Sequence, residues 1–344
     1  MSVVSQLKPH EMSWMTHQGV MEIMGVLCRD GGEGRFVGGV VRDVLLKRPI
    51  KDIDVATTLL PDEVLERLRA ASIKAIPTGF AHGTVTAVAH GKPIEITTLR
   101  HDVETDGRRA KVAFTTEWQA DAARRDFTMN ALYVDRTGQV YDYFGGLDDA
   151  RAGRVRFIGD AEERIQEDAL RILRFFRFQA VLGKAPIDDA GLQACITRRL
   201  SLKGLSRERI RDELFKLLAA QDPSPVFELM LHHGILDGVV PEERDLDCLK
   251  SVVGAEQALG LSDALRRNVA LLPKDINVIW DVCKRLKLSN KEIKRAKSMV
   301  GNDVHVHNAL SEDEAHAALY YLGKEIFLDR LLLSAGGHDV SDLY

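Results

Sequence analysis

The spacing of apolar residues changes near residue 150, and this change limits the fold more than any other feature of the sequence. Before it, apolar and polar residues alternate in short runs typical of strands, at 51–57, 84–89 and 93–99. Helical spacing occurs at 20–27 and 40–46, and again after Pro61. Beyond the change, helical spacing dominates from 165–180 onward. We therefore expect an α+β fold, in which a head with a small, mostly antiparallel sheet precedes an all-helical neck and body.

Length and composition agree with this division. A chain of 344 residues predicts two or three domains at roughly 100–200 residues each, and we place a head at 1–150, a neck at 151–220 and a body at 221–344. The formal net charge of -4 argues against a globally basic nucleic-acid binder but leaves room for local basic patches. The four cysteines are far apart in sequence and form no C-x-x-C pair, so we expect buried free thiols.

Two aspartates lie two residues apart in the run 51–55. On a strand, alternation would place Asp52 and Asp54 on one face while Ile53 and Val55 point into the core. Paired carboxylates repel each other unless a cation lies between them, and Mg²⁺ prefers carboxylate oxygens together with substrate phosphates. The motif therefore suggests metal-assisted phosphoryl transfer. For so short a motif alone, the alternative is a solvated strand face with two surface acids.

A glycine pair and an arginine precede these aspartates, in the segment GGVVRD at 38–43. Two glycines permit a close approach of the backbone to phosphate, and Arg42 offers a planar pair of donors to phosphate oxygens. Glu95 is a candidate third acid, because its side chain would lie opposite Ile94 and Ile96 on a predicted strand. The alternative for Glu95 is an ordinary exposed strand acid.

Three segments, in this order and spacing, resemble the class II tRNA nucleotidyltransferases and the bacterial poly(A) polymerases. They are GGVVRDVLLKRPIKDIDVAT at 38–57, RRDFTMNAL at 124–132 and EDALRILRFFRF at 167–178. The resemblance is firm over 34–180 and weak beyond. It implies a catalytic nucleotidyltransferase head, a neck with a nucleotide-selecting helix, and a body that contacts RNA.

The resemblance also implies roles for residues of the head. Asp52 and Asp54 would bind the metal, and we group Glu95 with them as catalytic. The nucleotide contacts in the head would be Gly39, Arg42 and Arg125. Asp126 and Asn130 would lie near the ribose.

The third segment implies an amino-acid template for the incoming base. Asp168 and Arg171 would form the template, and Arg174 and Arg177 would be further nucleotide contacts. On a helix over 166–178, this three-residue spacing would form a curved polar strip, with Leu170, Leu173 and Phe176 packed behind it. The alternative is an intrahelical Asp168–Arg171 salt bridge on a solvated helix.

The template chemistry follows from donor and acceptor patterns. Ionised Asp168 only accepts hydrogen bonds and Arg171 only donates them, which matches the amino group and ring nitrogen of cytosine and adenine. Guanine and uracil present the reverse order, and each mispaired buried group costs on the order of 1–3 kcal/mol. The pair would therefore select CTP and ATP.

Two basic stretches are candidate RNA contacts, although charge runs are usually solvated faces. The first comprises Arg198, Arg199, Lys203, Arg207, Arg209 and Arg211, and the second Lys284, Arg285, Lys287, Lys291, Lys294, Arg295 and Lys297. The pairs His232-His233 and His338-Asp339 are too isolated to define a metal site, so we expect no metal-dependent phosphohydrolase domain.

The expected function is template-independent addition of C, C and A to the 3′ end of tRNA from CTP and ATP, with Mg²⁺ as cofactor. A poly(A) polymerase of the same family is the first alternative; an inactive RNA-binding protein and a small-molecule nucleotidyltransferase are the others. A polar segment at 100–123, with Gly107 as pivot, is expected to be a mobile loop that shifts the template from C to A. The alternative is an ordinary surface excursion. Because no run of about 20 apolar residues occurs, we expect a soluble cytoplasmic protein without membrane association.

Overall fold

The computed structural model describes residues 3–105 and 110–334, and it leaves out the side chains of 102–112. These residues pack as two compact units. The first comprises 1–168 and 184–191, and the second comprises 169–183 and the chain from 192 onward. The boundary at residue 168 lies inside the segment expected to be the neck, and the three-part division at 150 and 220 stays a prediction.

The first unit contains one large sheet. In spatial order, its strands are β1 (Val3–Gln6), β10 (Gln139–Asp142), β9 (Leu132–Val134), β2 (Gly34–Val37), β3 (Asp54–Thr57), β6 (Lys92–Thr98), β5 (Thr84–Ala89) and β4 (Lys74–Gly79). Neighbouring strands are antiparallel except β3 and β6, which run parallel. The expectation of a mostly antiparallel sheet is confirmed, but with eight strands the sheet is larger than the small one expected.

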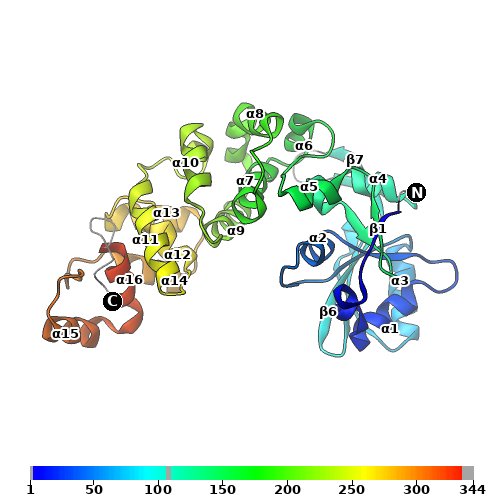
Figure 1. The fold of residues 1–344 in the computed structure, drawn as a ribbon, viewed down its shortest axis with the longest axis horizontal. Coiled ribbons are helices and arrows are strands. Elements are labelled where there is room, and N and C mark those ends of the chain that lie inside the picture. Colours follow the sequence, from blue (N-terminus) through cyan, green and yellow to red (C-terminus); the bar gives the residue numbers. More distant parts are fainter. Residues whose placement is uncertain (1–2, 106–109, 335–344) are drawn as a thin grey trace. The chain divides into compact units, whose positions relative to one another are not determined.

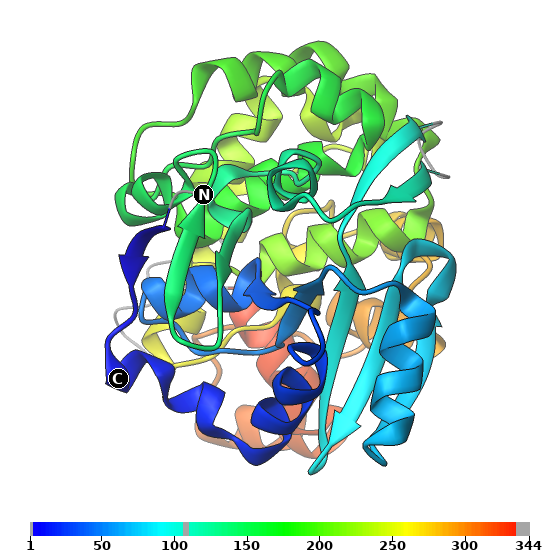
Figure 2. The same cartoon turned by 90° about the vertical axis from the view of Figure 1, so that its right-hand side faces the viewer.

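Two helices cover one face of this sheet. α1 (Gln18–Leu27) and α3 (Pro61–Ala70) contact each other and strand β5 (Figure 2). Their apolar faces and the inward side chains of the strands form the larger hydrophobic core, which includes Ile23, Leu68, Val55 and Ile96. Alternation along the strands therefore places Val55 in this core and turns Asp54 to the opposite face.

The opposite face carries a second, smaller cluster. It includes Ala56 of β3, Tyr133 of β9, and Trp118 and Ala122 of α4 (Trp118–Ala123). The polar residues of the site lie beside this cluster, because Asp54 alternates with Val55 and Glu95 alternates with Ile94 and Ile96.

The segment 100–123 is not a loop in its described residues. β7 (Arg100–Thr105) and β8 (Ala110–Phe114) pair as an antiparallel ribbon, and α4 follows. The loop prediction was wrong because backbone groups satisfy each other across the ribbon and Trp118 anchors α4 in the core. Residues 106–109, with the proposed pivot Gly107, lie outside the described residues.

The helix expected over 166–178 is interrupted at residues 168 and 169. α6 (Ala161–Glu167) ends just before Asp168, whose backbone is extended (φ -151°, ψ 102°), and α7 (Leu170–Leu182) begins two residues after Asp168. Asp168 and Arg171 therefore do not share one helix, and the predicted strip begins only at Arg171. Aspartate commonly marks helix ends because its short side chain competes for nearby backbone groups.

The second unit is helical, and no strand occurs among its described residues (Figure 1). Its helices after α7 are the end of α8 (Asp189–Arg198), η4 (Arg199–Gly204), α9 (Arg207–Leu218), α10 (Ser224–His232), η5 (Ile235–Gly238), α11 (Leu246–Ala258), α12 (Ala264–Ala270), α13 (Ile276–Arg285), α14 (Asn290–Met299), α15 (Glu312–Leu322) and α16 (Lys324–Ser334). The expected packing of Leu170, Leu173 and Phe176 is confirmed, since all three are buried. The four cysteines are free thiols, and three of them are buried. None of the described helices is long and apolar enough to cross a membrane.

Candidate active site

The acidic residues of the first unit meet where β3 and β6 run parallel. Asp54 is the first residue of β3 and lies opposite Glu95 of β6 in the register. Asp54 is half-buried, and its pKa is raised to about 6 by burial, then by the neighbouring charges of Glu95 and Asp52, against the opposing charge of Arg125. This carboxylate is therefore held in surroundings where a cation would favour its ionised form.

Asp52 lies outside the strand, which corrects the expected strand over 51–57. β3 begins at Asp54 because its neighbour β2 ends at Val37 and turns at Gly38. On the other side, Pro93 of β6 has no N–H to extend the pairing. Asp52 is exposed and acts on Asp54 through its charge, so the two acids lie close without sharing a strand face.

The glycine pair forms the turn from β2 into α2 (Gly39–Leu45). Gly38 has φ +73°, a conformation that favours glycine. A Cβ placed on Gly38 would lie 3.7 Å from Arg125 Nη1 and 3.7 Å from the Asn130 carbonyl oxygen, and one on Gly39 would lie 3.8 Å from Arg42 Nη2. The turn thus brings bare backbone beside both predicted nucleotide-binding arginines.

A hydrogen-bonded chain fixes the buried Arg42. Its Nη1 donates to Asn130 Oδ1 at 2.7 Å, and its Nε and Nη2 donate to Asp43 Oδ1 at 3.0 and 2.9 Å. Asn130 Nδ2 in turn donates to Asp126 Oδ1 at 3.0 Å. The segments around 42 and 126–130, far apart in sequence, therefore form one rigid polar group.

Arg125 is held by a buried acid and a phenol. Asp121 Oδ2 accepts from Arg125 Nη2 at 3.0 Å and from the Tyr133 hydroxyl at 2.8 Å, while Asp121 Oδ1 accepts from Arg124 Nη2 at 2.7 Å. Burial alone would raise the pKa of Asp121, but the charges of Arg125 and Arg124 and the Tyr133 hydrogen bond lower it to about 2. The carboxylate is ionised at neutral pH and orients both arginines.

The RRDFTMN segment is supported from behind by α5 (Gly146–Ala152). The Thr128 hydroxyl donates to Asp149 Oδ2 at 2.6 Å. A Cβ on Gly146 would lie 2.0 Å from the Thr128 carbonyl oxygen, so only glycine fits there. The hydrogen bond to Asp149 and the close contact with Gly146 therefore fix the position of the backbone that carries Asp126 and Asn130.

The predicted residues of α7 belong to the second unit. Glu213 of α9, only 4% exposed, lies 3.0 Å from Arg177 Nε and 3.9 Å from Arg174 Nη1. Arg177 and Glu213 form an ion pair, but the two atoms are not aligned for a hydrogen bond. Glu213 thus sets the position of two arginines predicted to contact nucleotide.

The structure brings together one part of the predicted site. Asp52, Asp54, Glu95, Gly39, Arg42 and Arg125 gather in the first unit. Asp168 ends the first unit, whereas Arg171, Arg174 and Arg177 lie in the second. Sequence reasoning missed Asp121, Tyr133 and Glu213. For Asp121 a signal existed, since an acid three and four residues before two arginines on a helix predicts ion pairs; Tyr133 and Glu213 had none.

The acids of the site meet part of what a metal ion needs. Among the described residues, no three His, Cys, Asp or Glu side chains form a preformed metal-binding cluster. The pKa of Asp54 is nevertheless raised, first by burial and then by the charges of Glu95 and Asp52, and a bound cation would offset these effects. Mg²⁺ is often held by one or two carboxylates plus substrate phosphates, so the acids fit a metal that arrives with a nucleotide.

Comparisons with known protein families match both units. Residues 34–156 match the model of the poly A polymerase head domain, and residues 186–246 match the probable RNA and SrmB-binding site of polymerase A. The first match contains all the candidate site residues of the head.

Individual relatives are similar over most of the chain. CCA tRNA nucleotidyltransferase 1, mitochondrial, of Danio rerio is 36% identical over 317 residues, which are 87% of this chain and 72% of that protein. The CCA-adding enzyme of Oceanobacillus iheyensis is 44% identical over 211 residues, 61% of this chain and 52% of that protein. The crystal structure of the Bacillus stearothermophilus CCA-adding enzyme in complex with CTP has a TM-score of 0.72 and 29% identity, covering 97% of this chain and 80% of that one.

Proposed function

The chain belongs to the family of the CCA-adding tRNA nucleotidyltransferases, and from this membership we infer that it adds C, C and A to the 3′ end of tRNA, using CTP and ATP and releasing pyrophosphate. The observation that carries this function is the 36% identity to a CCA tRNA nucleotidyltransferase over 87% of the chain. The carboxylate pair, the glycine turn and the fixed arginines of the head support it.

The chemistry needs an RNA 3′-hydroxyl to attack the α-phosphate of the bound nucleotide, with the bond to pyrophosphate broken. Asp52 and Asp54 would hold a divalent ion, Mg²⁺, beside Glu95, and enzymes of this family generally use such an ion. When bound, the ion supplies charge neutralisation and Lewis-acid activation. The protein's own contribution is positioning and electrostatics.

The two arginines of the head bind the triphosphate of the nucleotide. Arg42 and Arg125 donate to phosphate oxygens beside the Gly38-Gly39 turn, and Gly39 leaves the backbone open to the nucleotide. Asn130 and Asp121 keep the two guanidiniums in place, so little rotamer entropy is lost when the nucleotide binds.

Asp168 and Arg171 select the base. Arg174 and Arg177 are further nucleotide contacts. An ionised Asp168 accepts hydrogen bonds and Arg171 donates them, which matches the amino group and ring nitrogen of cytosine and adenine. Asp168→Ala and Arg171→Ala are expected to admit UTP and GTP while triphosphate binding is largely kept. Incorporation of each of the four labelled nucleotides measures this, and continued exclusion of UTP and GTP in both variants would contradict it.

The function itself is tested with tRNAs that lack zero to three terminal nucleotides, each incubated with one labelled nucleotide at a time. We expect CTP to be used by tRNAs lacking three or two nucleotides, ATP by tRNA lacking one, and neither by complete tRNA. Addition of long adenosine runs would identify the poly(A) polymerase alternative. A stall after two cytidines would show that the chain is not a full CCA-adding enzyme.

The compartment stays a prediction. A cytoplasmic location was expected from the sequence, whereas the Danio rerio relative is named as mitochondrial. Fractionation of the source cells, followed by immunodetection, decides between the two.

A further inference from the structure

A threonine lies directly beside the predicted catalytic acids on the open face of the sheet. In the register, Asp54 of β3 lies opposite Glu95 of β6, and Glu95 lies opposite Thr86 of β5. Directly opposed residues point their side chains to the same face. Neighbouring strands lie about 4.8 Å apart, so the row from Asp54 to Thr86 spans about 10 Å across three strands. The row therefore extends from the acids to Thr86 on the side away from β2.

A second row lies one step further along the same strands. It is formed by Ala56 of β3, Thr97 of β6 and Thr84 of β5. All three threonines of the two rows are half-buried and Glu95 is exposed, so a ligand can reach this face. The two rows offer the same hydroxyl chemistry, but only the row that contains Thr86 also contains acids.

The threonine hydroxyls of this face form two pairs. Thr86 Oγ1 lies 2.8 Å from Thr78 Oγ1 of β4, and Thr84 Oγ1 lies 3.1 Å from Thr97 Oγ1. A hydroxyl has one proton and two lone pairs, so each pair uses one of its two protons internally and keeps the other. Each pair can therefore donate one hydrogen bond and accept others, which is the combination that matches another hydroxyl group.

The groups predicted to bind the triphosphate lie on the opposite side of Asp54. The Gly38-Gly39 turn follows β2, and Arg42 and Arg125 lie beside that turn. Phosphoryl transfer places the attacking and the leaving oxygen roughly in line, on opposite sides of the phosphorus. With the pyrophosphate on the side of β2, the attacking hydroxyl comes from the side of β6 and β5. This is the side on which Thr86 lies.

We propose that Thr86 binds the 2′-hydroxyl of the terminal ribose of the RNA acceptor, and that this contact makes the enzyme select an RNA end over a DNA end. Thr78 orients the Thr86 hydroxyl through their hydrogen bond. The chemistry fits because the 2′-hydroxyl is the group by which the two ends differ, and it both donates and accepts hydrogen bonds. The proposal rests on the proposed function, since it concerns the acceptor of the same reaction.

The test compares two forms of a tRNA that lacks the terminal adenosine, one ending in cytidine and one in 2′-deoxycytidine. Fluorescence anisotropy gives Kd for each RNA, and addition of labelled ATP gives kcat/KM for each. The variants are Thr86→Val, which removes the hydroxyl at nearly constant shape, and the conservative Thr86→Ser, which keeps it. Circular dichroism and thermal unfolding verify that each variant is folded.

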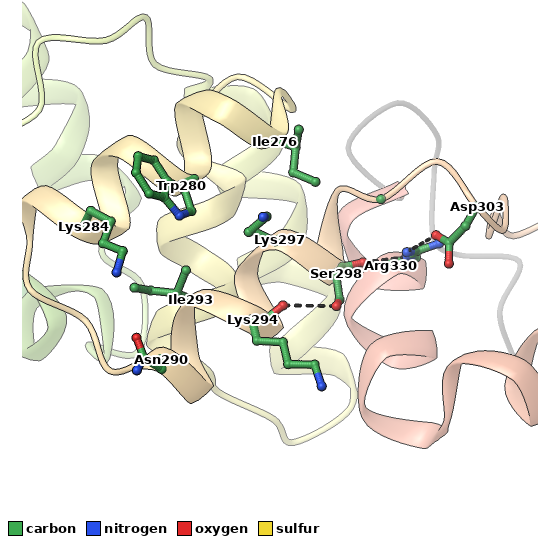
Figure 3. A pocket seen from close by; sticks show the side chains of 11 residues that line it. Ile276, Trp280, Lys284, Asn290, Ile293, Lys294, Lys297, Ser298, Asp303 and Arg330 are labelled. Atoms are coloured by element: carbon green, nitrogen blue, oxygen red, sulfur yellow. Dashed lines mark hydrogen bonds and ion pairs between the residues drawn. The ribbon is translucent and has the colours of Figure 1, made fainter.

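Two controls separate this contact from other effects. Thr84→Val removes a hydroxyl from the neighbouring row on the same strand. Lys294→Ala removes an exposed ammonium group from the second unit, where it lines a groove together with Trp280 and Lys297 (Figure 3). Loss of a positive charge can weaken the binding of any RNA, but it acts equally on the two RNA ends.

We expect the parent to prefer the cytidine end about tenfold in Kd and in kcat/KM, because the deoxy end leaves the Thr86 hydroxyl without its partner. Thr86→Val should lose this preference by weakening the cytidine end alone, with KM for ATP within twofold of the parent. Thr86→Ser should keep the preference. Both controls should keep it too, whatever their effect on affinity.

A parent that treats both ends alike would overturn the proposal, as would a folded Thr86→Val protein that keeps the preference. An equal loss for both ends in Thr86→Val would show that Thr86 only stabilises the sheet, and this also overturns the proposal. Failure of the proposed function is a separate result, because a parent without that activity adds adenosine to neither RNA. The Kd values for the two ends still decide the role of Thr86 in that case.

Discussion

At the scale of single residues, Asp54 is the side chain whose ionisation the fold changes most clearly in the active site. Its pKa is raised to about 6 by burial and by the nearby acids, whereas the pKa of an unfolded aspartate is about 3.9. A raised carboxyl pKa means that the folded state disfavours ionisation. The metal-free protein therefore loses stability as the pH rises from about 4 through 6, and the loss is complete above that range.

Replacement of Asp54 by Asn removes this ionisation and tests the electrostatic argument. We expect Asp54→Asn to gain stability relative to the parent as the pH rises from 4 to 7, by at most about 3 kcal/mol, and to lose more than 100-fold in nucleotide addition. Thermal unfolding in EDTA across this pH range measures the first effect. Asp148→Asn, at an exposed position, is the control and should show no such trend. A difference that does not change with pH would contradict the assigned surroundings of Asp54.

Asp121 belongs to the same scale, although it carries no predicted catalytic role. It is 1% exposed and ionised between two arginines and a tyrosine hydroxyl, so it acts as a positioning residue for Arg125. Because its pKa is lowered to about 2, its stabilising contribution is present above about pH 4 and is lost as the pH falls toward 2.

The expected consequence of Asp121→Asn is twofold. Two arginines lose their counter-charge, which should destabilise the head by about 3 kcal/mol at neutral pH. The freed Arg125 should also raise KM for CTP and ATP, while KM for tRNA changes little. Urea unfolding and steady-state kinetics measure the two effects, with Asp148→Asn as the control again. A stability loss with unchanged nucleotide KM would show that Asp121 is structural only.

At the scale of elements, the packing of α9 against α7 determines where the arginines of α7 lie. Glu213 is buried between these helices and faces Arg174, Arg177 and Lys216. Phe178 adds to this arrangement, because the Arg177 guanidinium lies 4.2 Å from the centroid of its ring. A residue of one helix thus orients predicted nucleotide contacts on another.

Glu213→Gln keeps the size of the side chain but removes its charge. We expect KM for both nucleotides to rise about tenfold with a smaller change in kcat, because the arginines lose the ion pair that orients them. Glu208→Gln, an exposed acid on the same helix, should leave both constants within twofold. An unchanged nucleotide KM in a folded Glu213→Gln protein would argue against nucleotide contacts by Arg174 and Arg177.

At the scale of the whole molecule, the chain consists of two units, and each of them buries many apolar side chains. The first has apolar clusters on both faces of a sheet. The second joins its helices through a buried ionic network. In this network, Glu256 of α11 binds Arg266 and Arg267 of α12 at 2.5 and 2.6 Å, and Asp329 of α16 binds Arg266 and Arg295 of α14, both at 2.8 Å.

Removal of one buried charge should therefore weaken the second unit selectively. In Glu256→Gln, two buried guanidiniums lose their carboxylate, which should cost about 3–5 kcal/mol. Hydrogen exchange followed by mass spectrometry should show faster exchange in α11, α12, α14 and α16, with the head unchanged. Glu228→Gln, whose exposed side chain pairs with Lys250, should cost less than about 1 kcal/mol. Equal acceleration in both units would mean that they unfold together.

The sequence alone determined the features that depend on local order along the chain. The periodicity change near 150 predicted a sheet-containing head and a helical remainder, because apolar spacing follows from the geometry of strands and helices. The three short segments predicted the family, which the comparisons confirm. Which residues bind metal and nucleotide stays a prediction.

Only the tertiary structure decided how distant side chains meet. The start of β3 at Asp54 depends on where its neighbours β2 and β6 can pair, and the break at Asp168 divides a segment whose spacing alone predicted one helix. The partners Asp121–Tyr133, Arg42–Asn130 and Glu213–Arg177 come from separate elements. Such contacts depend on packing between elements, because a buried charge takes whichever partner the fold brings within reach, and linear spacing does not encode that partner.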